Sequence, residues 1–109
     1  TTPIMLPDRI FVRHSNRMIK IMMADILYIE ADRNYSRIFT RQKEYMLATT
    51  LKHIEEKLPP DLFLRIHRSY IVHLAQVDEV AESHVVIGQK SIPLSSELRD
   101  KLLRNLRTL

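Results

Sequence analysis

The feature that most constrains the fold is a succession of short strand-like segments, each rich in isoleucine, valine or tyrosine and each followed by a few polar residues. In the first half of the chain these segments are residues 10–14, 17–21, 26–31, 35–40 and 44–48. Ser15-Asn16 separates the first two segments and Asp32-Arg33-Asn34 the next two, and such residues tolerate the dihedral angles of tight turns. The first half is therefore predicted to be a meander of short antiparallel strands with a polar, basic second turn.

The second half combines further strands with two short helices. An amphipathic pattern over residues 51–58 follows the candidate N-caps Thr49 and Thr50 and stops at Pro59-Pro60, which predicts a helix. The next strand-like segments are residues 63–66, 70–72, 77–80, 85–87 and 91–94. After Ser95, another N-cap candidate, one stripe of a C-terminal helix is predicted to hold Leu98, Leu102, Leu106 and Leu109. Two short helices among so many strands exclude a bundle and a doubly wound parallel sheet, so the predicted fold class is mainly β.

The length of 109 residues fits one compact domain, which is expected to span residues 8–109. Residues 1–7 contain two prolines and no initiator methionine, so they are expected to be a linker from a missing upstream domain. The net charge of +4 suits a polyanionic partner. The chain lacks cysteine, a signal-peptide pattern and an apolar run approaching roughly 18 residues. These absences favour a soluble cytoplasmic protein without membrane contact.

The sequence lacks the patterns that catalysis or cofactor binding requires. Gly88 is the only glycine, which excludes a glycine-rich phosphate loop. The five histidines show no metal-site spacing, and His67 and His73 are expected to be partly exposed strand residues. Ser69 lies close to His67 but no third orienting group is in evidence, so a nucleophilic serine is not favoured. We therefore expect no enzyme activity, no metal and no cofactor.

Aromatic side chains in these segments could provide stacking platforms for single-stranded nucleic acid. They are Tyr28, Tyr35, Phe39, Tyr45, Phe63 and Tyr70. Because they lie within alternating or apolar runs, packing in the core is the favoured interpretation for most of them.

Four blocks of sequence, taken in order, resemble the LytTR family. They are residues 25–31 (DILYIEA) followed by Asn34-Tyr35, residues 51–58 with Pro59, residues 63–72 (FLRIHRSYIV), and residues 92–95 (IPLS). The third block is the strongest, and the resemblance covers about residues 8–106.

The resemblance implies a DNA-binding domain, built as an elongated array of short antiparallel strands with small helices. Such domains occur chiefly in bacterial response regulators of two-component systems, behind a receiver domain. Loops, rather than a recognition helix, would enter successive major grooves of paired direct repeats in promoters. The partners implied are duplex DNA and an upstream receiver or sensor domain, with a dimer on DNA as a further expectation.

The contact residues that the resemblance implies come from three segments. They are Arg33, Asn34, Ser36 and Arg37 after YIEA, Arg68 in RIHRSY, and Ser95, Ser96 and Arg99 after IPL. Arg68 carries a planar fork suited to guanine O6 and N7, so we expect it to be the main base reader. Arg33, Arg37 and Arg99 are expected to grip phosphates, and Ser95 and Ser96 to bind phosphate at a helix start. Asn34 and Ser36 could contact either a base edge or a phosphate, and the sequence does not distinguish the two.

Two departures from the family pattern stand out. Ser96 and Glu97 occupy positions where members often have an arginine. After Ile71-Val72 this chain has His73, where many members have an asparagine. The third segment is therefore expected to bind DNA less strongly.

The sequence leaves two other classes of protein open. One is a protein-interaction module that dimerises through exposed β-edges or the leucine-lined C-terminal helix, without reading DNA. The other is a single-stranded RNA-binding protein. For any of the contact residues, a solvated turn position or a helix cap is the simpler structural explanation.

Overall fold

The computed structural model describes residues 8–109, so the linker predicted over residues 1–7 lies outside the described residues. The strands are β1 (Arg9–His14), β2 (Arg17–Met22), β3 (Ile26–Asp32), β4 (Tyr35–Thr40), β5 (Glu44–Leu47), β6 (Phe63–His67), β7 (Tyr70–His73), β8 (Glu79–Val80), β9 (His84–Ile87) and β10 (Lys90–Pro93). The helices are α1 (Leu51–Lys57) and α2 (Ser96–Arg104), and two 3-10 turns are η1 (Met23–Asp25) and η2 (Leu74–Gln76). The mainly β prediction is confirmed. Within residues 8–109, neither helix has the length and apolar character needed to span a membrane.

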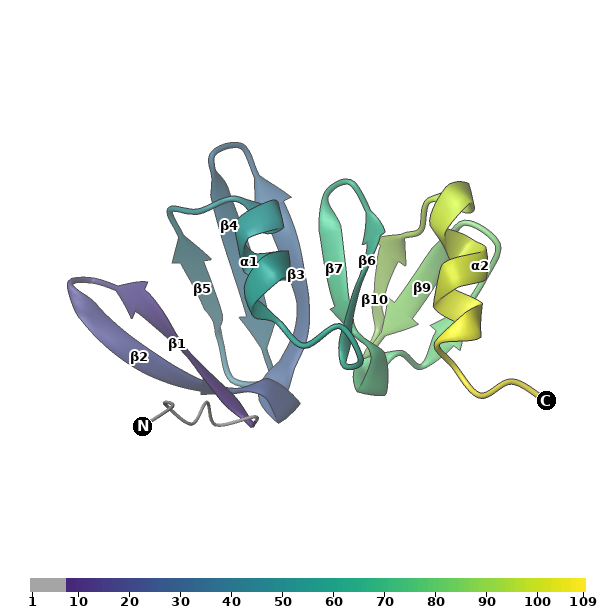
Figure 1. The fold of residues 1–109 in the computed structure, drawn as a ribbon, viewed down its shortest axis with the longest axis horizontal. Coiled ribbons are helices and arrows are strands. Elements are labelled where there is room, and N and C mark those ends of the chain that lie inside the picture. Colours follow the sequence, from purple (N-terminus) through teal and green to yellow (C-terminus); the bar gives the residue numbers. More distant parts are fainter. Residues whose placement is uncertain (1–7) are drawn as a thin grey trace, which may run out of the picture.

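The elements lie side by side in a row (Figure 1), with principal extents of 42 × 34 × 24 Å. β1 and β2 form a separate two-stranded hairpin at one end of the row. Its turn is Ser15-Asn16, with φ angles of 51° and 62°. Two-residue hairpin turns of this kind need a positive φ at both positions, which matches the right-handed twist of the strands. The first predicted hairpin is therefore confirmed.

The centre of the molecule is an antiparallel sheet of five strands in the order β5-β4-β3-β7-β6. Strand β3 pairs on both sides, so that Glu30 lies opposite Arg37 of β4 and Tyr70 of β7. Because β3 ends close to where β7 begins, the β3–β4 turn and the β6–β7 turn lie at the same edge of the sheet (Figure 1).

A three-stranded sheet in the order β10-β9-β8 and helix α2 form the other end of the row. The backbone N–H of Leu94 donates to the carbonyl of Ser83 (3.0 Å), and that of Ser95 donates to the carbonyl of Ile66 (2.8 Å). The second bond ties the start of α2 to strand β6. It therefore brings the start of α2 to the edge that holds the β6–β7 turn (Figure 1).

Both faces of the central sheet bury apolar side chains, because neighbouring residues in a strand point to opposite faces. On one face Ile29 and Ile38 pack with Ile54 of α1, in a cluster that also includes Val12 of the N-terminal hairpin. On the other, Tyr28 and Val72 belong to a cluster with side chains of β9, β10 and α2. The two clusters hold the three sheets and both helices together as one domain.

Helix α1 begins where the sequence indicates. The side chain of Thr50 accepts a hydrogen bond from the backbone N–H of His53 (3.1 Å), which satisfies one of the unpaired donors of the first turn. The helix ends at Lys57, before Pro59.

Helix α2 is shorter than its leucine pattern predicts. It ends at Arg104, with Asn105 as C-cap, so the predicted stripe does not continue to Leu109, which is fully exposed. Leu102 is completely buried and Leu98 half-buried. Within the helix, Leu102 therefore packs on the domain's own core.

The burial of His73 corrects another prediction. His73 is 4% exposed, its ring stacks on Phe63 with centroids 4.6 Å apart, and its Nδ1 lies 3.0 Å from the carbonyl oxygen of Ile26. The expectation of a partly exposed residue is wrong for His73 and confirmed for His67. Core packing is confirmed for Tyr28 and Phe63.

Candidate nucleic-acid interface

Three segments predicted to contact DNA meet along one edge of the molecule, which we call the turn edge. It consists of residues 33–34 in the β3–β4 turn, residues 68–69 in the β6–β7 turn, and residues 95–96 at the start of α2 (Figure 1). The backbone N–H of Ala31 donates to the carbonyl of Ser69 (2.8 Å), and the bond from Ser95 to Ile66 joins the second and third segments. Hydrogen bonds between backbones therefore fix the relative positions of all three.

The β3–β4 turn presents Arg33 and Asn34, and both are exposed. It is a two-residue turn, because Asp32 already pairs with Tyr35. Arg33 has a φ of 59°, a left-handed conformation that costs a residue with a Cβ about 1–2 kcal/mol. Tyr35, the first residue of β4, is 48% exposed. It is an exception to the expected core packing.

Arg37 is less free to grip a phosphate than the sequence suggests. Its Nη2 lies 2.8 Å from the carboxylate of Asp32 and its Nη1 4.0 Å from that of Glu44, and the side chain is 30% exposed. Its Nε is buried and has no hydrogen-bond partner among the described residues. The guanidinium therefore holds Asp32, at the base of the turn, in place.

Ser36 does not reach the surface, and its predicted role as a contact residue is revised. The side chain is 0% exposed, and its hydroxyl donates to the carbonyl of Thr49 (2.8 Å) in the β5–α1 connection. Ser36 is buried because side chains alternate between the two faces of a strand, so that Ser36 shares the inward face of β4 with Ile38. A DNA groove cannot touch this hydroxyl without the strand moving.

The β6–β7 turn holds its backbone firmly while exposing one side chain. Arg68 is exposed, and its carbonyl accepts a hydrogen bond from Nη2 of Arg65 (2.5 Å). The N–H of Ser69 donates to Nδ1 of His67 (3.1 Å), and the Ser69 carbonyl accepts from Ala31 (2.8 Å). The Arg68 guanidinium is thus carried by a turn with three backbone groups that are hydrogen-bonded within the protein.

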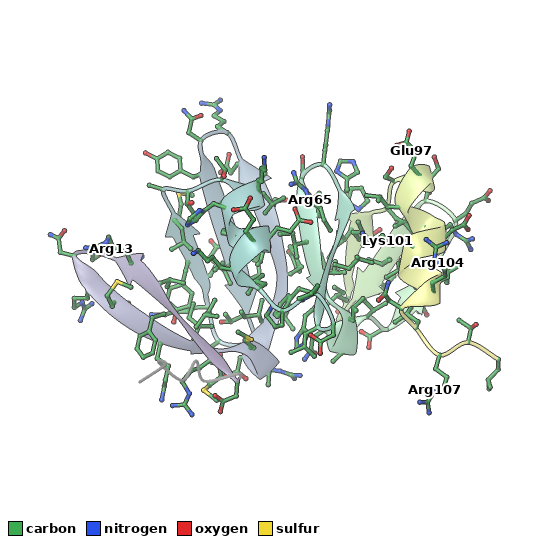
Figure 2. All side chains as sticks on the ribbon, viewed as in Figure 1. Arg13, Arg65, Glu97, Lys101, Arg104 and Arg107 are labelled. Carbon is green, nitrogen blue, oxygen red and sulfur yellow. The ribbon has the colours of Figure 1, made fainter. Side chains whose placement is uncertain are left out.

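The third segment offers DNA little positive charge, because Glu97 is exposed there and Arg99 is half-buried. Ser95 occupies the N-cap position of α2, but its side chain makes no capping hydrogen bond, and Ser96 is exposed. Glu97 is exposed in the first turn and lies at the turn edge (Figure 2). Arg99 is half-buried, and its Nε donates to the carbonyl of Ala81 (3.3 Å). Lys101 and Arg104 lie further along the helix, away from the turn edge (Figure 2).

Close to the turn edge, the hydroxyl of Tyr70 donates a part-buried hydrogen bond to the carboxylate of Glu30 (2.5 Å). This bond to the carboxylate, reinforced by burial, raises the pKa of the Tyr70 hydroxyl to about 12. Tyr70 therefore stays a neutral hydrogen-bond donor at physiological pH, and the bond fastens β7 to β3 one residue beyond the β6–β7 turn.

Neither a metal-binding cluster nor a cavity accounts for the turn edge. Residues 8–109 contain no group of three or more His, Asp or Glu side chains that could hold a metal ion. A cavity of about 560 Å³ lies between the N-terminal hairpin, β5 and α1, and none of the predicted contact residues lines it. What the turn edge offers is a row of exposed polar turns on a rigid sheet.

Comparison with known proteins identifies the chain. It belongs to the LytTR family, because the model of the LytTr DNA-binding domain matches residues 16–107. A solved LytTr DNA-binding domain from Bacillus cereus has the same fold, with a TM-score of 0.75, 18% sequence identity, and coverage of 90% of this chain and 95% of that one. The predicted family, the predicted fold and the prediction of a DNA-binding domain are confirmed.

Similar curated proteins are transcriptional regulators. The CO-responsive transcriptional regulator RcoM of Rhodospirillum rubrum is 48% identical over 54 residues, which are 50% of this chain and 23% of that protein. The heme-containing CO-sensing transcriptional regulator RcoM 1 of Paraburkholderia xenovorans is 34% identical over 79 residues, 70% of this chain and 30% of that protein. The transcriptional regulatory protein YpdB of Escherichia coli is 33% identical over 73 residues, 67% of this chain and 30% of that protein. The chain spans less than a third of the length of each of these relatives.

Proposed function

We propose that the turn edge reads duplex DNA, with Arg68 in a major groove as the main base reader. The observation that supports this is the exposed Arg68 side chain on a turn that is anchored by its neighbours. A guanidinium can donate two hydrogen bonds to guanine O6 and N7, and a fixed turn limits the entropy lost when it does so.

The flanking segments position the duplex. Arg33 grips a phosphate, and Asn34 contacts a base edge or a phosphate. At the start of α2, the backbone N–H of Ser96 and the hydroxyl of Ser95, which makes no capping hydrogen bond, bind a phosphate, while the Ser95 N–H stays bonded to the Ile66 carbonyl. Arg37 and Arg99 contribute less, because their guanidinium groups already contact Asp32 and the Ala81 carbonyl. Ser36 is no longer part of the contact set.

The wider setting of the domain is also a proposal. The relatives are transcriptional regulators more than three times as long as their matched regions. We therefore place this domain in a bacterial regulator of the cytoplasm, behind a receiver or sensor domain. It would bind paired direct repeats in promoter DNA as a dimer, one domain on each repeat.

A titration with matched arginine variants tests the reading role. Genomic fragments that the domain retains are selected first, and affinities are then measured by fluorescence anisotropy for a selected duplex and for a scrambled one. Arg68→Ala should weaken binding to the selected duplex by about 5- to 150-fold, the range for one bidentate arginine–guanine contact. It should weaken binding to the scrambled duplex far less.

The control is Arg107→Ala, which removes the same charge from an exposed residue beyond α2, away from the turn edge (Figure 2). Its affinity for the selected duplex should stay within about twofold of the wild type. Equal losses from the two variants would contradict the assignment of Arg68, and the absence of any retained fragment at low salt would contradict duplex reading altogether.

A further inference from the structure

The guanidinium of Arg65 contacts the β6–β7 turn from below, and this contact has a consequence for DNA reading. We propose that Arg65 is a positioning residue, which fixes the backbone of the turn so that the Arg68 side chain is presented to the DNA. The inference rests on the proposed role of Arg68.

Three hydrogen bonds link Arg65 to its surroundings. Its Nη2 donates to the Arg68 carbonyl (2.5 Å), its Nε to the His67 carbonyl (3.4 Å), and its Nη1 to the carboxylate of Glu55 (3.4 Å). Arg65 lies on β6 directly beneath the turn (Figure 2), and Glu55 lies on α1. One side chain therefore connects two carbonyls of the turn to the neighbouring helix.

The β6–β7 pairing is irregular at this point, which gives Arg65 a structural task. The register shifts between Arg65, which pairs with Ile71, and His67, which pairs with Tyr70. The carbonyl of the residue between them, Ile66, accepts instead from Ser95 at the start of α2. A bulge bends a strand and re-aims the side chains beyond it. The contacts of Arg65 with both turn carbonyls fix that bend in one conformation.

The same contacts argue that Arg65 does not itself grip a phosphate. A guanidinium has five N–H donors, and one donor on each of its three nitrogens already points at an acceptor within the protein. Its charge is paired with Glu55, and its side chain is 28% exposed. Arg65 therefore acts on DNA through Arg68, and its loss should not change the number of phosphates that the domain contacts.

This distinction can be measured as a salt dependence. Each phosphate contact contributes about −0.9 to the slope of log K against log salt concentration. Arg65→Gln should weaken binding to the selected duplex by roughly 5- to 30-fold, as expected for residues in one hydrogen-bonded network. It should leave the salt slope and the affinity for a scrambled duplex unchanged. Arg104→Gln, an exposed arginine of α2 with the same change of charge, serves as the control and should change none of the three.

A double-mutant cycle separates positioning from general damage. Once Arg68→Ala has removed the reader, adding Arg65→Gln should weaken binding by less than about twofold, because the two losses share one cause. Urea unfolding of each variant shows that it is folded under the binding conditions. Should Arg65→Gln not fold, Glu55→Ala provides the test, since it removes only the anchor on α1 and should produce a smaller loss with the same unchanged slope.

The outcomes distinguish this inference from the proposed function. If Arg68→Ala itself has no specific effect, the reading role fails. If Arg68→Ala weakens specific binding while Arg65→Gln does not, only the positioning role fails. A salt slope shallower by about 0.9 in Arg65→Gln, or losses that add in full in the double variant, would also overturn it.

Discussion

Replacing Ser36 by alanine separates a buried structural hydroxyl from a DNA contact. The hydroxyl donates to the Thr49 carbonyl (2.8 Å), and the side chain is 0% exposed. Alanine removes this hydrogen bond, leaves the part-buried carbonyl without that partner and opens a space of one oxygen atom. A neutral hydrogen bond contributes about 0.5–1.5 kcal/mol, and an unsatisfied carbonyl adds to the loss, so we expect a destabilisation of about 1–2 kcal/mol. For a domain of this size each kcal/mol lowers the Tm by about 4–8 °C.

Two assays on the same protein samples check this prediction. Urea unfolding should give the lower free energy of unfolding for Ser36→Ala, and Ser91→Ala, an exposed serine of β10, should be close to the wild type. Anisotropy titrations well below the Tm of both proteins should give the same DNA affinity within about twofold. An unchanged stability with an affinity reduced by more than about fivefold would show instead that the hydroxyl contacts DNA.

Further predictions concern charge, capping and pH. Glu97→Gln removes an exposed negative charge at the turn edge and should strengthen DNA binding by about two- to fivefold at low salt, less at high salt; an unchanged affinity in anisotropy titrations would contradict the placement of DNA there. Thr50→Ala removes the acceptor for the His53 N–H and should cost about 1 kcal/mol in urea unfolding. Because the folded-state pKa of Tyr70 is raised to about 12, stability should fall as pH rises from about 10, the usual tyrosine value, towards 12. Tyr70→Phe should lack most of that fall, as unfolding at several alkaline pH values would show.

The strand pattern could be read from the sequence because local chemistry decides it. Ser15-Asn16 and Asp32-Arg33-Asn34 are short polar interruptions between β-branched runs, and both contain a two-residue turn. The second turn is one residue shorter than predicted, because Asp32 is the last residue of β3. The pattern of residues 51–58 with Thr50 before it likewise becomes α1. These features depend on neighbours along the chain, so they need no knowledge of the tertiary structure.

Which face of each strand is buried was harder to predict. Ser36 and Arg37 were both predicted to contact DNA, yet alternation puts Ser36 on the buried face with Ile38 and leaves Arg37 on the opposite one. The apolar pattern of β4 contained this signal. His73 offered no comparable signal, because its burial depends on Phe63, its partner on β6, and on the carbonyl of Ile26, both distant in sequence.

The candidate site was predictable only as three separate segments. Nothing local indicates that the Ser69 carbonyl bonds to Ala31, or that Ser95 bonds to Ile66, and these two bonds assemble the turn edge. The role of Arg65 could not be foreseen for the same reason, since its partners lie in a bulged turn and on α1. In the sequence, nothing distinguishes Arg65 from any other arginine in a predicted strand.

Whether DNA lies along the turn edge can be measured by the amide chemical shifts of the domain as it is titrated with a selected duplex. We expect large shifts at residues 33–34, 67–69 and 95–97, with little change at residues 41–43 in the β4–β5 turn, at the opposite end of β4. Large shifts at residues 41–43 with little change at the turn edge would contradict it.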